Sequence, residues 1–306
     1  MGQRDRQVFR DSQLEEQFWR DGFLTLPLLN ETDLAYCREL FKRMDPKIDT
    51  QFYSSIDSPD VPYRYEVDRK LRELLDDKVA AILLDYTAIA YTFIVKRPGK
   101  QSAILSHVDD THVDQNKYAS VNIWCPLVDT NEINGALEVL RGSHRLPYPP
   151  RGLGLPFPYS SYEPMFRDKM EMVYQKAGVA ILYHDMLIHR SPPNMSDSIR
   201  PAVITGTIPQ EATPIIYFQY PGLAKDKVEK FAVNRDFWIS FDKRERPERG
   251  VKSLGFEDYY AITISDEEFW EYIRLPEHKI KQAQQEPVKI TPSKGLLARI
   301  KRFFGQ

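Results

Sequence analysis

Cysteine is scarce in this sequence. Cys37 and Cys125 are the two cysteines among 306 residues. Two cysteines cannot build the disulfide framework that stabilises small secreted domains. The charged opening, MGQRDRQVFRDSQLEEQFWRDGF, also lacks the apolar segment of a secretory signal. We therefore expect a protein of the reducing cytoplasm.

Long hydrophobic runs and an excess of one charge are missing as well. No apolar run reaches the ~18 residues that suggest a membrane-spanning helix. Lys and Arg number 42 against 44 for Asp and Glu, which gives a net charge of −2. A nucleic-acid partner usually requires a basic excess, so none is expected. Hydrophobic residues make up 42% of the chain, enough to build a large core.

The first part of the chain shows helical periodicity. Residues 12–20 and 68–84 are predicted helices, and the short apolar run 23–28 is a predicted strand. Between them, apolar residues recur at helical spacing over 31–44. Asn30 stands directly before that segment, where a residue that caps the helix N-terminus belongs.

From about residue 86 the pattern changes to short β-type runs. These runs are rich in Val, Ile, Thr and aromatic residues, and turn residues separate them. Most have no helix of useful length between them, which predicts an antiparallel sandwich or barrel with a core at about 86–215. The runs are 86–95, 118–128, 135–140, 178–183 and 200–208.

One long segment interrupts these strands. Residues 145–168 carry many Pro, Gly and aromatic residues. A loop of this length in a compact domain often forms a lid or a substrate wall, and the alternative is an irregular packed segment.

The last part mixes helical and polar patterns. Residues 256–262 and 265–275 are predicted to form short helices. Residues 1–280 are expected to form a single domain. Residues 281–293 read as a polar linker, and 294–306 as a short basic amphipathic helix. We expect this helix to dock on its own barrel or on a twin subunit in a homodimer. The alternative is docking on an anionic membrane surface or on a carrier protein.

The stretch LSHVDDTHVD at 105–114 contains His-Val-Asp twice, as His107 with Asp109 and His112 with Asp114. Side chains alternate along a strand, so a His and an Asp two positions apart can reach the same metal ion. The two pairs lie five positions apart, and a continuous strand would turn them to opposite faces. Only one pair can easily face the interior.

A further ligand is expected from another strand. His189 follows an apolar run, and two His with one carboxylate form the facial triad of non-haem Fe(II) oxygenases. Arg200 comes eleven residues after His189, past a Pro-Pro-Asn turn. A hairpin would return Arg200 to the metal, where its guanidinium could bind a dicarboxylate co-substrate.

Four stretches stand in a specific order: His107-Val108-Asp109, SVNIWCPLVD ending at Asp129, NGALEVLRGSHR at 134–145, and His189 to Arg200. In this order they resemble the phytanoyl-CoA dioxygenase family of Fe(II)/2-oxoglutarate oxygenases. The resemblance spans roughly residues 12–215. It implies a double-stranded β-helix, a cupin-like jelly roll, with the N-terminal helices packed on it.

The resemblance also assigns the metal site. It implies that His107, Asp109 and His189 hold Fe(II) and carry catalysis. His107 stands at the family's usual distance before Trp124, whereas His112 is too close to it. The second pair, His112 and Asp114, is then a look-alike on the outgoing loop. His112 is expected at the surface or on a loop, and a role in substrate contact is the alternative.

The co-substrate site follows from the same resemblance. Arg200 and Ser191 are expected to hold the far carboxylate of 2-oxoglutarate, and Trp124 to line that pocket. Val108 stands where the family often has Gln, which removes one hydrogen bond to the co-substrate.

The implied activity is hydroxylation of an unactivated C–H bond of a small-molecule or acyl-type substrate, using O2 and releasing succinate and CO2. One alternative is a cupin-like isomerase or a dioxygenase that needs no 2-oxoglutarate, but it would have no use for Arg200. Another is a catalytically inactive jelly roll that acts as a binding module, against which the intact triad argues.

Overall fold

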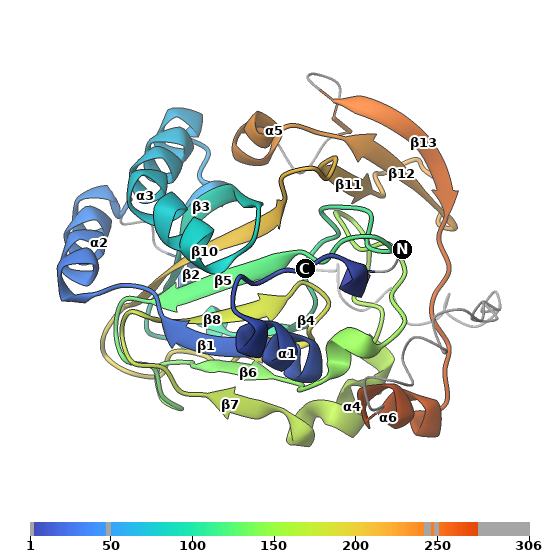
Figure 1. Cartoon of the computed structure of the whole chain (residues 1–306), viewed down its shortest axis with the longest axis horizontal. Helices are drawn as coiled ribbons and strands as arrows, with labels where there is room; N and C mark the ends of the chain where they lie inside the picture. Colours follow the sequence, from blue (N-terminus) through green and yellow to red (C-terminus); the bar gives the residue numbers. More distant parts are fainter. Residues whose placement is uncertain (1–2, 47–49, 242–245, 248–250, 275–306) are drawn as a thin grey trace.

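Two antiparallel sheets face each other in the computed structural model of this chain (Figure 1). The structure describes residues 3–46, 50–241, 246–247 and 251–274. The larger sheet has the strand order β1–β8–β5–β10–β3–β2. Its strands are β1 Phe23–Pro27, β2 Phe52–Ser54, β3 Tyr86–Lys96, β5 Val121–Pro126, β8 Val179–His184 and β10 Arg200–Pro209.

The smaller sheet has the order β4–β9–β6–β7. Trp124 and Ile181 of the larger sheet pack with Leu137 and Val139 of the smaller one in a common apolar cluster. This arrangement confirms the predicted all-β core, a double-stranded β-helix. The strands of the smaller sheet are β4 Ile104–His107, β6 Leu137–Val139, β7 Glu171–Val173 and β9 His189–Ser191.

The N-terminal helices pack on the outer face of the larger sheet, as predicted (Figure 1). Leu71, Leu75 and Val79 of α3 are buried in one cluster with Phe93 and Val95 of β3. The alternate residues of β3 therefore point inward, toward the space between the sheets. The helices are α1 Ser12–Asp21, α2 Glu31–Met44 and α3 Val61–Ile82.

Short-range signals explain where these helices begin. The Asn30 side chain accepts from the Asp33 amide at 2.9 Å and forms a capping box, which confirms the predicted start of α2. The prediction of 68–84 was wrong at its beginning, because α3 starts at Val61. Asp60 caps that helix, and a proline stands in its first turn.

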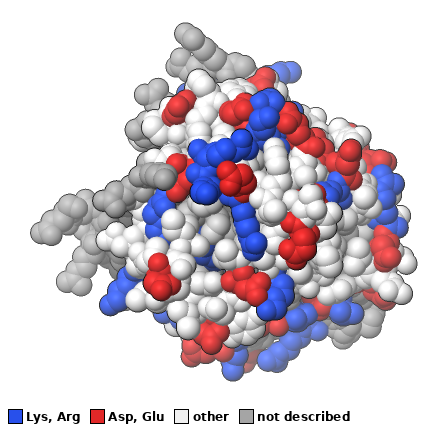
Figure 2. All heavy atoms as spheres, turned by 90° about the vertical axis from the view of Figure 1, so that its left-hand side faces the viewer, with Lys and Arg blue, Asp and Glu red and all other residues white. Residues whose placement is uncertain are grey.

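Charges of both signs are interspersed on the face that carries α2 and α3 (Figure 2). Within α3, Arg69 pairs with Glu66 at 2.7 Å and with Glu73 at 2.5 Å. Exposed pairs of this kind contribute only about 0.3–0.5 kcal/mol each. Their main consequence is a well-solvated helix surface.

A third sheet follows the β-helix, in the order β11–β12–β13. The predicted helix at 256–262 was wrong, because residues up to Asp258 pair with β12 as an edge strand. The prediction at 265–275 is confirmed by α6. These elements are β11 Ile215–Phe218, β12 Lys227–Ala232, α5 Arg235–Ser240, β13 Lys252–Asp258 and α6 Asp266–Arg274.

The segment 145–168 forms a packed irregular wall and includes the short helix α4, Glu163–Phe166. Tyr159 and Phe166 are fully buried in a cluster with Phe269 of α6. The Leu153 amide donates to the carbonyl of Tyr217 in β11 at 3.1 Å. The segment thus connects the β-helix to the third sheet, and its closure as a lid stays a prediction.

The predicted linker at 281–293 and the amphipathic helix at 294–306 lie outside the described residues. Among the residues that the structure describes, no helix is long and apolar enough to cross a membrane.

Candidate functional site

His107, Asp109 and His189 converge between the two sheets, although Asp109 lies just beyond the end of β4 and not on the strand itself. One ligand atom from each lies within 4.8 Å of the others. His107 ends β4 and pairs with His189, which begins β9. The nearest Asp109 oxygens lie 3.9 Å from Nε2 of His107 and 3.9 Å from Nε2 of His189.

Hydrogen bonds to the backbone set the orientation of both imidazoles. Nδ1 of His107 lies 2.8 Å from the Leu105 carbonyl, and Nδ1 of His189 lies 2.9 Å from the Leu187 carbonyl. A carbonyl only accepts, so each Nδ1 carries the proton and each Nε2 presents a lone pair. Burial and the neighbouring His107 lower the pKa of His189 to about 4, which keeps that imidazole neutral at neutral pH. Two imidazoles and a carboxylate suit Fe(II).

Asn122 of β5 supports the Asp109 carboxylate, a contact the sequence reasoning missed. Its Nδ2 donates to Oδ2 of Asp109 at 2.5 Å. Gly206 of β10 makes room for it, because a Cβ at this glycine would lie 2.9 Å from the Asn122 side-chain oxygen. Asn122 stands two positions before Trp124 on a buried strand, and this spacing could have revealed it as an inward polar residue.

The second His-Val-Asp pair lies on a loop, as expected. The alternation of side chains along one strand does not explain this position. The continuous strand assumed for 105–114 does not form, since β4 ends at His107. Asp114 caps the next turn by accepting from the Asn116 amide at 3.1 Å. His112 lies on this loop, one of the two positions expected for it. It is only partly exposed, its Nδ1 is buried, and its ring lines a pocket beside Asp109.

Arg200 and Trp124 come together as the resemblance implied. Arg200 is only 1% exposed, and its guanidinium carbon lies 5.1 Å from the Trp124 ring centroid. Its Nε and Nη1 are buried and find no hydrogen-bond partner among the described residues. Burial lowers the pKa of Arg200 to about 9, so the group is still cationic at neutral pH. An unpaired buried cation is unfavourable, and a carboxylate ligand would satisfy it.

Lys96 is a second buried cation-forming residue in this region that sequence reasoning missed. It pairs with Arg200 across β3 and β10. Its Nζ donates to the Ser191 carbonyl at 2.9 Å and to the Pro192 carbonyl. Burial, together with the charge of Arg200, lowers the pKa of Lys96 to about 6, so the amine is neutral at pH 7.5.

Ser191 was expected to contact the co-substrate. Its hydroxyl donates to the Gly135 carbonyl at 2.7 Å in this structure. A contact between Ser191 and 2-oxoglutarate therefore stays a prediction.

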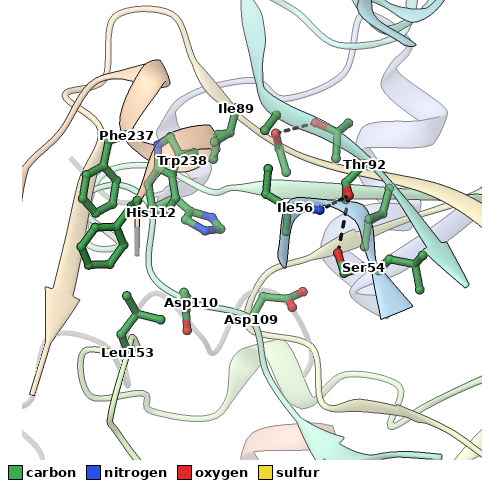
Figure 3. A pocket seen from close by; sticks show the side chains of 16 residues that line it. Ser54, Ile56, Ile89, Thr92, Asp109, Asp110, His112, Leu153, Phe237 and Trp238 are labelled. Carbon is green, nitrogen blue, oxygen red and sulfur yellow. Dashed lines mark hydrogen bonds between the residues drawn. The ribbon is translucent and has the colours of Figure 1, made fainter. Parts of the chain in front are cut away.

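A cavity of about 260 Å³ adjoins the Asp109 carboxylate (Figure 3). Asp109 belongs to both the triad and the cavity wall. Apolar side chains from distant parts of the chain form most of the remaining lining, among them Ile89 of β3, Leu153 of the 145–168 segment and Trp238 of α5. A molecule in this cavity would lie next to a metal held by the triad.

The other described histidines have structural surroundings. His184 is fully buried and stacks on Phe18 with ring centroids 5.6 Å apart. His144 is also buried, and its Nε2 lies 3.1 Å from the Trp19 carbonyl.

Comparisons with known proteins give relatives in sequence and in structure. A phytanoyl-CoA dioxygenase from Arabidopsis thaliana is 32% identical over 116 residues, which are 36% of this chain and 40% of that protein. The phytanoyl-CoA dioxygenase domain-containing protein 1 of Danio rerio is 30% identical over 129 residues, 39% of this chain and 43% of that protein. This chain thus spans about two-fifths of the length of these curated relatives.

Solved structures show a weaker similarity. HygX from Streptomyces hygroscopicus, crystallised with nickel and 2-oxoglutarate bound, is 15% identical, with a TM-score of 0.49 over 66% of this chain and 88% of that chain. The α-ketoglutarate-dependent carbocyclase SnoK from nogalamycin biosynthesis is 18% identical, with a TM-score of 0.48 over 67% and 86%.

A family model covers more of this chain than either curated relative does. The model of phytanoyl-CoA dioxygenase, PhyH, matches residues 31–202. This range exceeds half of the chain and contains the triad, Trp124, Ser191 and Arg200. The chain belongs to the phytanoyl-CoA dioxygenase family of Fe(II)- and 2-oxoglutarate-dependent oxygenases.

Proposed function

We propose that this protein is an Fe(II)- and 2-oxoglutarate-dependent dioxygenase that hydroxylates an unactivated C–H bond of a small-molecule or acyl-type substrate. The carrying observation is the placement of an oriented His-Asp-His triad in the same barrel as a buried guanidinium without a partner among the described residues. A metal-binding isomerase or a dioxygenase independent of 2-oxoglutarate would not require that guanidinium.

The triad residues would hold the metal through Nε2 of His107, Nε2 of His189 and the Asp109 carboxylate. Bound Fe(II), with 2-oxoglutarate and O2, supplies the oxidising chemistry and yields succinate and CO2. Asn122 fixes one oxygen of Asp109, which limits rotation of the carboxylate. Both imidazoles are held by the backbone, so the site is organised before metal binding.

Arg200 would orient the co-substrate. Its guanidinium can form charge-assisted bonds with the far carboxylate of 2-oxoglutarate, and Trp124 restricts the guanidinium from one side. Lys96 is neutral near pH 7.5 and donates to the backbone carbonyls of Ser191 and Pro192. Its proposed role is to position this backbone and not to supply a positive charge for the co-substrate.

The cavity would hold the substrate. It reaches Asp109, and its apolar walls exclude water from the reacting C–H bond. Asp109 also influences which reaction occurs, because a carboxylate ligand leaves no room for a halide ion at its position on the metal. Hydroxylation is therefore the reaction we propose over halogenation.

Metal-dependent succinate formation tests this proposal. The full-length protein would be loaded with Fe(II) without oxygen, mixed with 2-oxoglutarate and aerated, and succinate measured by mass spectrometry. We expect slow succinate formation even without the substrate, abolished in His189→Ala and retained in Asp114→Ala. An iron-loaded protein that binds no 2-oxoglutarate and forms no succinate would contradict the proposal.

A further inference from the structure

The walls of the cavity beside Asp109 suggest what kind of molecule it accommodates. Phe237, Trp238 and Phe241 of the α5 region form one side, and Ile89 of β3 and Leu153 add aliphatic surface (Figure 3). Aromatic faces and edges of this kind favour a ring-containing ligand. A volume of about 260 Å³ suits a small ligand of one or two fused rings.

Several polar groups on the cavity wall already have partners. The Thr92 hydroxyl oxygen accepts from the Ile56 amide at 3.0 Å and lies 3.5 Å from the Ser54 hydroxyl. Thr205 donates its hydroxyl to the Gly206 carbonyl at 3.1 Å. These groups would lose existing hydrogen bonds by turning toward a ligand.

His112 is different. Its side chain forms no hydrogen bond with any residue that the structure describes, and its Nδ1 is buried. Its ring stands edge-on to Trp238, with centroids 4.8 Å apart and an interplanar angle of 86°. It lies over Gly206, where an added Cβ would be 3.7 Å from its Cε1.

A polar ring that lines a cavity and has no hydrogen-bond partner is stabilised when a ligand supplies one. Burial lowers the pKa of His112, despite the opposing charge of Asp110, so the imidazole is neutral. A neutral imidazole has one donor and one acceptor nitrogen, and a hydroxyl group complements either. Most of the cavity wall is apolar, which disfavours charged ligands.

We propose that this cavity binds an uncharged, hydroxyl-bearing ring compound, with the hydroxyl on His112 and the ring against Trp238. His112 is then a specificity-determining residue. The inference deepens the proposed function and rests on it only in assigning this ligand class to the substrate. Binding itself does not require turnover.

Two probes of equal shape test the proposal: 2-naphthol and 2-methylnaphthalene, which differ by a hydroxyl in place of a methyl group. Their dissociation constants would be measured by equilibrium dialysis against the full-length protein loaded with Ni(II) and 2-oxoglutarate. We expect 2-naphthol to bind about tenfold more tightly, which corresponds to about 1.4 kcal/mol. Trp238→Ala should weaken both probes.

The variants separate the hydroxyl contact from packing. In His112→Phe the dissociation constants of the two probes should differ by less than twofold, while 2-methylnaphthalene still binds. In His112→Gln part of the preference for 2-naphthol should remain. Asp114→Ala is the matched control on the same loop. Equal binding of both probes to the unsubstituted protein, binding of neither probe, or an unchanged preference in the His112 variants would overturn the proposal. Failure of succinate formation would instead count against the proposed reaction.

Discussion

Asp109 is the residue on which three parts of the site meet. It faces both imidazoles of the triad, accepts from Asn122 and lines the cavity. In the proposed site Asp109 would contact both the metal and the substrate, so its loss should weaken the binding of both. The neighbouring His112 touches only the substrate side, which makes the two residues separable by substitution.

We expect His107→Ala, Asp109→Ala and His189→Ala each to lose iron binding and turnover. Each removes one of three ligand atoms that lie within 4.8 Å of one another. His112→Ala and Asp114→Ala should keep their iron content, measured by metal analysis after anaerobic loading. Iron loss in His112→Ala together with retention in His107→Ala would show that the wrong pair was assigned.

Arg200→Met should have opposite effects on co-substrate binding and on stability. A bidentate charge-assisted contact contributes about 1.5–3 kcal/mol, so the dissociation constant of 2-oxoglutarate should rise roughly tenfold to a hundredfold. Without ligand, removal of a buried cation that has no partner among the described residues should raise the melting temperature.

Titration of the Fe(II)–2-oxoglutarate charge-transfer band would measure the first effect, and thermal unfolding without ligand the second. Arg200→Lys is the control, since it keeps a charge but not the planar fork. An unchanged midpoint for 2-oxoglutarate in Arg200→Met would remove Arg200 from the co-substrate site.

At the scale of elements, a buried carboxylate ties α5 to the rest of the fold. Asp68 of α3 is 2% exposed and pairs with Arg72 at 3.1 Å and with Arg235 of α5. It also accepts from the Tyr91 amide of β3 at 2.9 Å. Since α5 carries Trp238, this ion pair positions one wall of the cavity.

We expect Asp68→Ala to destabilise the protein by about 3–5 kcal/mol, because it leaves a buried amide and a partly buried arginine without their partner. Urea unfolding would measure the loss. Asp76→Ala, which removes only a half-exposed partner of Arg72, should change stability by less than about 1 kcal/mol. Similar losses of stability in both variants would show that the burial of Asp68 does not determine its contribution to stability.

The 145–168 segment should show two levels of mobility. Tyr159 and Phe166 are fully buried, so the residues around them should resist hydrogen exchange in the free protein. Residues around Leu153, which lines the cavity, should gain protection when 2-oxoglutarate and 2-naphthol are added. Unchanged protection at 151–154 would indicate a rigid wall and no lid.

At the scale of the whole molecule, Lys96 makes stability depend on pH. The pKa of Lys96 is about 6 in the folded protein, and its ordinary value is 10.5. Between pH 6 and pH 10.5 the unfolded chain therefore binds a proton at this residue that the folded chain does not bind. Stability therefore rises with pH across that window and falls as pH drops toward 6. The slope from one such group is about 1.4 kcal/mol per pH unit.

The variant Lys96→Met should lack this contribution. Unfolding by urea at pH 6.5 to 9 should show a flatter dependence than the unsubstituted protein, even though the hydrogen bonds to Ser191 and Pro192 are lost. Lys100→Met, at an exposed position, should follow the unsubstituted protein. A parallel course of all three would mean that Lys96 stays protonated when folded.

Local patterns predicted most of the fold. The helical spacing and the cap at Asn30 located α2, and the β-rich runs located β3, β5, β8 and β10. These elements follow from periodicity and capping, which act over a few residues. The edge strand β13 was missed because its pairing with β12 depends on a distant segment.

The sequence by itself determined the fold class, the family and the three residues proposed to hold iron. It could do so because their order and spacing are properties of the chain. Tertiary structure alone decided that Asn122 holds Asp109, that Lys96 lies beside Arg200, and that Trp238 encloses His112. The contact between Asn122 and Asp109 spans 13 positions, whereas the other two contacts join segments far apart in sequence. Burial lowers the pKa of both His112 and Lys96. Spacing along a chain carries no information about either.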